Sequence, residues 1–299
     1  MICPRCNSTF VKKNGRRNRK NAGLVQMMIC NTCARNFDVP IDSFIDKQPP
    51  DKRGIIGPGQ VFRYKSDTTI NLHCLTDIHV GAIEHDWKKF KQAVNKIKRD
   101  ENSRWFGNGD LLELIPPGYK AINQRGQNIP PDEQYLHFIE LVEPIKDKCL
   151  WLRGGNHDFL RSYTILDFDV VKTLAKELNV PYFRYPGYAQ FDIQGTMWNI
   201  VSGHGKSGAK NGDLELDKMA AVYSDGHVFV LGHNHQLYAK PVDSLTINND
   251  KEELKRRWYI RGGSFLRYAD YARYSFFPLI RTGWVTMILT KKEIKCKEN

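Results

Sequence analysis

Short apolar runs recur along the chain, and each is followed within a few residues by a polar cluster. The runs have the length and the flanking residues of buried strands; they are Ile70 to Leu75, Trp105-Phe106, Cys149 to Leu152, Trp198 to Val201, and Val228 to Leu231. The clusters are Asp77-Ile-His79, Gly107-Asn-Gly-Asp110, Gly155-Asn-His-Asp158, Gly203-His204 and Gly232-His-Asn-His235. Open α/β sheets place their ligands at the carboxyl ends of neighbouring strands. The repeated order of strand and cluster therefore predicts one metal site to which all five clusters contribute.

Segments with helical periodicity alternate with these strands. After the first cluster, Trp87, Phe90, Val94 and Ile97 recur on one face of a helix that we predict for residues 85–99. Further helices are predicted near 132–146, 166–178 and 213–223. Strands that alternate with helices are typical of the α/β class.

Two Cys-x-x-Cys pairs mark the N-terminus as a separate small domain. Cys3, Cys6, Cys30 and Cys33 leave 23 residues between the pairs, close to the spacing of the two halves of a structural zinc site. Four thiolates suit a closed tetrahedral Zn²⁺ that stabilises a segment too small to fold around its own core. The segment resembles a zinc ribbon. We assign residues 1–45 to the ribbon, the proline- and glycine-rich residues 46–68 to a linker, and 69–299 to the domain with the polar clusters.

Positive charge is concentrated in the ribbon. The whole chain carries a formal net charge of +12 with an isoelectric point near 9.3, which favours polyanionic partners. The run from Lys12 to Lys20 has Asn14-Gly15 as its expected turn. We expect its basic tip to contact nucleic-acid phosphates through Arg16, Arg17, Arg19 and Lys20. The alternative is a ribbon that packs on the body of the protein or mediates self-association.

Other features of the sequence indicate the cellular compartment of the protein. No apolar run approaches the roughly 18 residues of a membrane span, and the first six residues lack the basic and apolar segments of a secretion signal. Seven cysteines, four of them in Cys-x-x-Cys pairs, favour metal binding in a reducing compartment over disulfides. We therefore expect a cytoplasmic protein. The sequence leaves open whether it is a monomer or a homodimer.

The five clusters, in this order, resemble the calcineurin-like metallophosphoesterases, whose pattern is D-x-H, G-D, G-N-H-D/E, H and G-H-x-H. The resemblance covers roughly residues 70 to 265, and five clusters in order are specific where one alone is not. It implies a metallophosphoesterase-type αββα sandwich behind the zinc ribbon and the hydrolysis of phosphate esters. One position departs from the pattern: many members have G-D-x-x-D, whereas this chain has Gly109-Asp-Leu-Leu-Glu113.

The resemblance also implies a role for each cluster residue. The implied ligands of one ion are Asp77, His79 and His235, those of a second ion are Asn156, His204 and His233, and Asp110 would bridge the two. His157 would protonate or stabilise the leaving oxygen, and Glu113 would orient His157. Ligation by nitrogen and oxygen without thiolates suits Mn²⁺, Fe or Zn²⁺, of which we expect Mn²⁺.

Three functions fit such a centre. The first is a nuclease that hydrolyses phosphodiester bonds in nucleic acid, because Asp77 to Gly81 and Gly155 to Asp158 resemble the recombination-repair exonuclease branch and the basic ribbon would anchor the substrate. The alternative is a phosphomonoesterase for phosphoproteins or nucleotides, with the ribbon as a docking module. The third is a nucleic-acid-binding protein that has lost catalysis, which the filled ligand positions disfavour. Arg153 and Arg161 would hold a substrate phosphate or remain surface cations.

Overall fold

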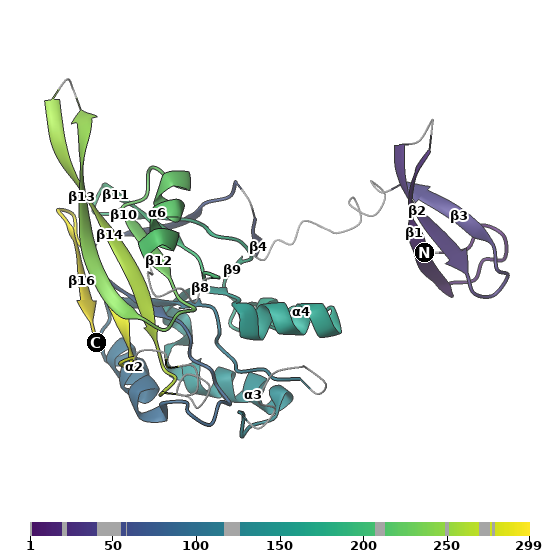
Figure 1. The fold of residues 1–299 in the computed structure, drawn as a ribbon, viewed down its shortest axis with the longest axis horizontal. Coiled ribbons are helices and arrows are strands. Elements are labelled where there is room, and N and C mark those ends of the chain that lie inside the picture. Colours follow the sequence, from purple (N-terminus) through teal and green to yellow (C-terminus); the bar gives the residue numbers. More distant parts are fainter. Residues whose placement is uncertain are drawn as a thin grey trace. The chain divides into compact units, whose positions relative to one another are not determined.

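The computed structural model divides the chain into two compact units, Met1–Lys52 and Arg53–Asn299 (Figure 1). It describes residues 2–19, 23–40, 55–57, 59–116, 126–206, 213–248, 251–268, 276 and 279–299. Lys20 lies outside the described residues, as do the side chains of Arg16, Arg17 and Arg19. Within these ranges, none of the helices has the length and apolarity needed to cross a bilayer.

The N-terminal unit is an antiparallel sheet of β1 (Val11–Arg19), β2 (Gly23–Cys30) and β3 (Asn36–Pro40). Each Cys-x-x-Cys pair is followed by a left-handed residue, Asn7 at φ 55° and Ala34 at φ 58°. The N–H of each donates to the carbonyl of the first cysteine in its pair, at 3.0 and 2.8 Å. These two equivalent turns bring the four thiols together.

The Asn14-Gly15 pair is not the turn of this sheet. The pairing of β1 with β2 shifts register between Lys13 and Arg16, and Gly15 has φ 83°, so the pair forms a bulge within β1. Residues 20–22, which connect the strands, lie outside the described ranges. The predicted turn is wrong because a left-handed glycine serves a bulge as well as a hairpin turn.

The described residues of the larger unit form one curled, 13-stranded sheet of mixed direction. Its strands are β4 (Ile55–Ile56), β5 (Phe62–Ser66), β6 (Ile70–Leu75), β7 (Ser103–Asn108), β8 (Cys149–Arg153), β9 (Tyr182–Phe183), β10 (Gly187–Ile193), β11 (Thr196–Ser202), β12 (Val228–Leu231), β13 (Leu237–Asn248), β14 (Lys251–Ser264), β15 (Gly283–Leu289) and β16 (Ile294–Glu298). One half runs β4–β9–β8–β7–β6–β15 and the other β14–β12–β11–β10–β5. Among the described residues, β14 and β15 join the halves through two residue pairs.

Three apolar clusters show that the two halves pack face to face with helices outside. The helices are α2 (Trp87–Arg99), α3 (Pro131–Val142), η1 (Glu143–Lys148), η2 (Asn156–Leu160), α4 (Arg161–Leu166), α5 (Val170–Glu177) and α6 (Asp213–Val222). One cluster joins β6, β7, β8 and β15 to β10, β11, β12 and β14. A second lies between the first half and α2, α3 and α5, and a third between the other half and α6. The predicted αββα sandwich is therefore confirmed.

The predicted linker is too long, because β4 and β5 lie within residues 46–68. β5 pairs in parallel with β10, and the ring of Phe62 lies 5.1 Å from that of Trp151 in the core between the halves. Phe62 and Tyr64 are one strand period apart, so both face this core. The sequence does not reveal β5 because the strand has only these two apolar positions and lies among prolines and glycines, which are typical of a linker.

The sequence also gives no prediction of the long hairpin of β13 and β14. Figure 1 shows the two strands extending away from the rest of the unit. Leu245 pairs across the strands with Leu254, and both side chains are exposed. Apolar residues on an exposed ladder break the inside-outside alternation on which strand prediction depends.

A buried histidine lies in the middle of the first half of the sheet. His73 of β6 is fully buried, and its Nδ1 accepts the indole N–H of Trp284 at 3.1 Å. Because an indole N–H only donates, the proton of the neutral ring is on Nε2, 2.9 Å from the hydroxyl of Ser103. Burial lowers the pKa of His73 to about 3.

We predict that His73 destabilises the fold in acid. Its folded pKa of about 3 lies below the unfolded value of 6.5, so the unfolded state takes up the proton first and stability is lost as the pH falls from 6.5 towards 3. The loss from this one group is about 1.4 kcal/mol per pH unit. Urea unfolding of wild type and His73→Gln across this window measures it. We expect a flatter pH dependence in the variant, and equal slopes would contradict the prediction.

Candidate metal centre

The loops that follow five strands converge at one end of the sandwich. They carry Asp77 and His79 after β6, Asp110 after β7, Asn156 after β8, His204 after β11, and His233 and His235 after β12. Backbone hydrogen bonds join neighbouring loops, from the N–H of Asp77 to the carbonyl of Gly109 at 2.9 Å and from the N–H of His79 to the carbonyl of Asp110 at 3.0 Å. The structure thus brings together the side chains that the sequence places at separate strand ends.

Asp77, His79 and His235 form the first group of converging ligand atoms. Nε2 of His235 lies 3.3 Å from Oδ1 of Asp77 and 3.3 Å from Nε2 of His79. Nδ1 of His79 faces Oε2 of Glu113 at 2.8 Å. Because a carboxylate only accepts, Nδ1 carries the proton of the neutral ring, and Nε2 presents its lone pair to the group.

Asp110, His204 and His233 form the second group, and Asn156 lies among them. Nε2 of His204 is 3.1 Å from Oδ2 of Asp110 and 3.2 Å from Oδ1 of Asn156. The same Asn156 oxygen is 2.7 Å from Nδ1 of His233. Nδ1 of His204 faces the carbonyl of Asn108 at 2.9 Å, so in the neutral ring the lone pair again points into the group.

Both groups have the chemistry of metal sites. Carboxylate, amide and imidazole lone pairs that meet in a buried place are unfavourable unless positive charge joins them. Atoms that share one ion at about 2.1 Å lie roughly 3 to 3.5 Å apart, close to the separations in both groups. Burial raises the pKa of Asp110, yet the charges of His204 and His157 hold it well below its usual range. Burial lowers the pKa of His204, but Asp110 outweighs it and raises this pKa to about 10.

Unusual backbone conformations hold the ligands in these groups. Positive φ occurs at Asp77 (50°), His79 (54°), Asp110 (51°), His233 (70°) and His235 (59°). Residues other than glycine rarely adopt this backbone conformation, and each such residue costs about 1 kcal/mol or more. Glycines leave room for the close approach: a Cβ at Gly155 would lie 2.2 Å from Oδ1 of Asp110, and one at Gly232 would lie 2.5 Å from Oδ2 of Asp77. The tight loops therefore depend on glycine at both positions.

Glu113 lies between two histidines. Its Oε2 is 2.8 Å from Nδ1 of His79 and 3.3 Å from Nδ1 of His157, and its backbone carbonyl accepts from Arg161 at 2.7 Å. Nε2 of His157 is 3.1 Å from a guanidinium nitrogen of Arg161 and 4.0 Å from Oδ2 of Asp110. His157 thus borders the second group without belonging to it. Glu113 is closer to His79 than to His157, a contact that the sequence analysis does not anticipate.

Arg153, at the end of β8, lies inside the sandwich. Its side chain is 2% exposed, with one guanidinium nitrogen donating to the hydroxyl of Ser202 at 3.1 Å and Cζ 5.2 Å from the ring centroid of Phe183. Burial lowers its pKa to about 10. Both readings of Arg153, as a phosphate contact or as a surface cation, are therefore wrong, because strand alternation turns this side chain inward.

Two polar residues with no predicted role hold the loops of the centre. The carboxylate of Asp158 is fully buried and accepts the N–H groups of Leu111 at 2.6 Å and Gly155 at 2.7 Å. It thereby joins the loop after β7 to the loop after β8. The hydroxyl of Thr76 donates to Oδ2 of Asp77 at 2.6 Å. Asp158 is visible in the third cluster, but spacing alone does not separate a carboxylate that holds a loop from one that binds metal.

The four cysteines of the N-terminal unit form a further group. Sγ of Cys3 lies 3.6 Å from Sγ of Cys33, and Sγ of Cys6 lies 3.6 Å from Sγ of Cys30. Sulfurs around a zinc ion at about 2.3 Å are about 3.8 Å apart, whereas those of a disulfide are about 2.05 Å apart. The arrangement fits a structural zinc ion and not two disulfides.

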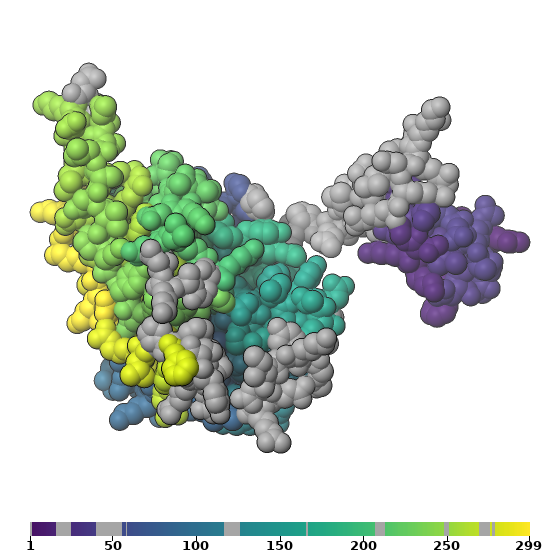
Figure 2. All heavy atoms as spheres, viewed as in Figure 1, coloured from purple at the N-terminus to yellow at the C-terminus, as the bar shows by residue number. Residues whose placement is uncertain are grey.

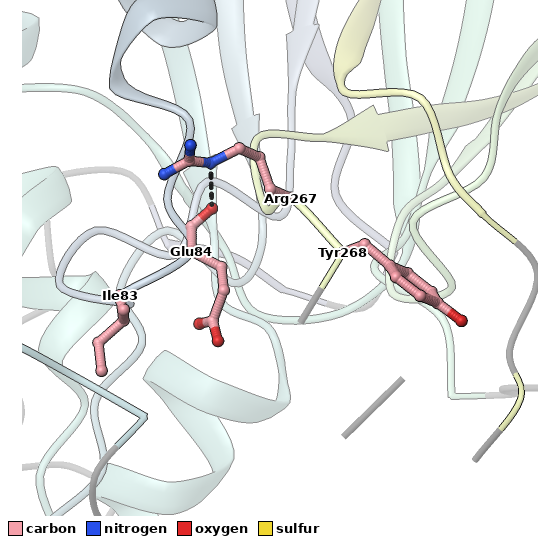
Figure 3. Close-up of a pocket in the computed structure, with 4 residues that line it drawn as sticks. All are labelled: Ile83, Glu84, Arg267 and Tyr268. Atoms are coloured by element: carbon pink, nitrogen blue, oxygen red, sulfur yellow. Dashed lines mark hydrogen bonds between the residues drawn. The ribbon is translucent and has the colours of Figure 1, made fainter. Parts of the chain in front are cut away.

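An open cleft continues from the loop after β6. It is lined by Ile83, Glu84, Arg267 and Tyr268 (Figure 3). Arg267 donates from Nε to the carbonyl of Glu84 at 3.4 Å. The walls of the cleft thus include a guanidinium and a phenol ring, from Arg267 and Tyr268.

The sequence matches no protein-family model and no curated protein. Among solved structures, the chain is similar to vacuolar protein sorting 29 from Entamoeba histolytica, complexed with Zn²⁺, at 12% identity and a TM-score of 0.42 over 77% of this chain and 98% of that chain. The same protein from Cryptosporidium parvum is 12% identical with a TM-score of 0.43, over 78% of this chain and 99% of that chain. A conserved uncharacterized protein from Streptococcus pneumoniae, described as a predicted phosphoesterase, is 14% identical with a TM-score of 0.33, over 78% of this chain and 100% of that chain. Similarity at this level establishes no function, which has to come from the residues of the centre.

We predict that Asp110→Asn weakens metal binding by the larger unit. The substitution keeps the shape of the side chain but removes the charge that faces His204 and His157. An ion at about 100 times its Kd stabilises the fold by about 2.7 kcal/mol, so Mn²⁺ added to chelator-treated protein should raise the Tm of the wild type more than that of the variant. Calorimetry measures both, with Asp243→Asn in the exposed part of β13 as the control. An equal rise in all three proteins would contradict the assignment.

Proposed function

We propose that the chain is a calcineurin-like metallophosphoesterase that hydrolyses phosphate esters at a dinuclear centre. The convergence of the two lone-pair groups at the strand ends, with His157 beside them, is the observation that supports this best. The two groups also divide the ligands as the resemblance implies, with Asp77, His79 and His235 in one and His204 and His233 in the other. Two divalent ions, when bound, would supply Lewis acidity and lower the pKa of an attacking water.

The side chains next to the ligands would position the ester and move a proton. Nε2 of His157, which accepts from Arg161 in the neutral ring, lies beside the second group, and in the protonated ring it would donate to the leaving oxygen. Arg161, which lies 3.1 Å from this nitrogen, would hold a phosphoryl oxygen through its forked guanidinium. Glu113 faces Nδ1 of both His79 and His157, so it directs Nε2 of His79 into the first ligand group and Nε2 of His157 towards the ester.

We further propose that the ester is a phosphodiester of nucleic acid. The net charge of +12 favours a polyanion, and Lys12 and Lys13 of β1 are exposed. Lysine and arginine on an exposed ribbon would bind phosphates and position the strand without reading its sequence. We expect Mn²⁺ at the dinuclear centre and one Zn²⁺ in the ribbon.

An assay panel tests the substrate class. Purified full-length protein with Mn²⁺ is offered single-stranded and duplex DNA, RNA, bis-p-nitrophenyl phosphate and p-nitrophenyl phosphate. We expect cleavage of nucleic acid and of the diester. Hydrolysis of the monoester alone would instead establish a phosphomonoesterase, and binding of nucleic acid without hydrolysis of any ester would establish an inactive binding protein.

We predict that His157→Ala keeps both ions of the centre but slows hydrolysis about 100-fold or more, because a general acid contributes on this order. The loss should be smaller on p-nitrophenyl esters, whose leaving group needs little protonation. Steady-state rates and metal analysis of the same preparation measure the two effects. Loss of an ion in this variant would make His157 a ligand and exclude the proposed role.

We predict that neutralising Arg16, Arg17, Arg19 and Lys20 together weakens nucleic-acid binding and flattens its salt dependence. Each lost phosphate contact removes about 0.9 from the log-log slope on duplex DNA. Hydrolysis of p-nitrophenyl esters should persist, because none of the four residues belongs to a ligand group. Neutralising Lys291, Lys292, Lys295 and Lys297, which are exposed on the larger unit, is the control with the same change of charge. Equal affinity of the ribbon variant and wild type across a salt titration would show that the ribbon is not the anchor.

A further inference from the structure

Three aromatic rings and one guanidinium form an exposed cluster in the larger unit. The rings of Phe159 and Tyr163 are stacked, with centroids 5.5 Å apart. Cζ of Arg184 lies 5.3 Å from the ring centroid of Tyr163, 5.8 Å from that of Phe159 and 6.0 Å from that of Tyr185. Tyr163 and Tyr185 are 40% and 48% exposed. We call these four residues the Arg184 stack.

The Arg184 stack belongs to the segment that carries the catalytic candidates. η2 starts at Asn156 and continues directly into α4, so Phe159 and Tyr163 follow His157 by two and six residues. Six helical residues advance the chain by only about 9 Å. The hydroxyl of Ser162 donates to the carbonyl of Asp158 at 2.7 Å, which fixes α4 to the loop of the centre. Teal atoms of this region, where Figure 1 labels α4, are visible on the surface in Figure 2.

The surroundings of the Arg184 stack suit a ligand with flat apolar groups and negative charge. Leu160, Ile165 and Phe168 of the same segment are 55%, 41% and 47% exposed, and exposed apolar side chains that gather in this way mark binding surfaces. The hydroxyl of Tyr163 is a hydrogen-bond partner of Arg184, and no carboxylate in the described part of the chain forms an ion pair with this guanidinium. A nucleotide offers both a π face to the rings and a phosphate to Arg184.

We propose that the Arg184 stack binds unpaired bases of the substrate strand next to the phosphate held at the metal centre. Tyr163 and Tyr185 stack on the bases, and Arg184 contacts the backbone. Bases within a duplex are stacked on each other and do not reach the rings, so the centre prefers single strands and frayed ends to blunt duplex. The proposal rests on the nucleic-acid substrate proposed above.

The test compares kcat/KM of full-length variants with Mn²⁺ on four substrates: a single-stranded DNA oligonucleotide, its RNA counterpart, the blunt DNA duplex and bis-p-nitrophenyl phosphate. Tyr163→Leu/Tyr185→Leu keeps apolar area but removes the π faces. We expect it to lose about 10- to 100-fold on the single strand, with the small ester unchanged because it has no nucleotides beyond the scissile phosphate. A loss on DNA and RNA alike would show recognition of bases, and a loss on one only would identify the substrate.

Two further variants separate stacking from other effects. Tyr163→Phe/Tyr185→Phe retains the rings and should retain activity on single strands. Leu245→Ala/Leu254→Ala removes comparable exposed apolar groups from the hairpin of β13 and β14 and should behave as wild type.

The outcomes separate the two proposals. Should Tyr163→Leu/Tyr185→Leu cut single strands as well as wild type, the Arg184 stack proposal is overturned and the nuclease proposal stands. Should wild type hydrolyse the small ester but no nucleic acid, the nuclease proposal fails, and the Arg184 stack proposal fails with it. If Tyr163→Phe/Tyr185→Phe loses as much activity on single strands as Tyr163→Leu/Tyr185→Leu, the proposal that the rings stack on bases is also overturned.

Discussion

Lone pairs crowded at the ends of five strands are the constraint on which the rest of the structure depends. Oxygen and nitrogen acceptors of the two ligand groups approach within 2.7 to 3.3 Å of one another in a largely buried place. In the neutral forms of His79 and His204, hydrogen bonds from Nδ1 direct Nε2 into these groups. Such a cluster is stable only with positive charge at its centre. The demand for positive charge therefore follows from geometry and does not depend on any similarity to other proteins.

The sandwich supplies the rigidity that holds this cluster together. Asp77 is fixed on several sides, because its N–H donates to Gly109, its carbonyl accepts from Phe265 and its carboxylate accepts from the N–H of His233. The carboxylate of Asp158 joins two further loops. These bonds, together with packed sheet layers on both sides, offset the cost of left-handed backbone at the ligands. The same loops lead directly into η2 and α4, so the centre and the Arg184 stack share one fixed segment.

The sequence predicts the strands next to the centre better than the periphery. β6 and β12 are found at their predicted bounds, because β12 is a continuous apolar run and Ile70, Leu72, Cys74 and Leu75 mark β6 in spite of Asn71 and His73. β5 and the hairpin of β13 and β14 are not predicted, because their apolar residues are few or exposed. The sequence lists the residues of the candidate site but not their distances. Spacing therefore does not reveal that Glu113 lies closer to His79 than to His157, or that Arg153 points into the core.

Anomalous diffraction from crystals grown with Mn²⁺ tests the central claim most directly. Two peaks are expected about 4 Å apart. One should lie within coordination distance of Asp77, His79 and His235, the other within that distance of Asn156, His204 and His233, and both should contact Asp110. A single ion, or an ion bound by Glu113 and His157 in place of one of these groups, would contradict the dinuclear centre and the chemistry assigned to it.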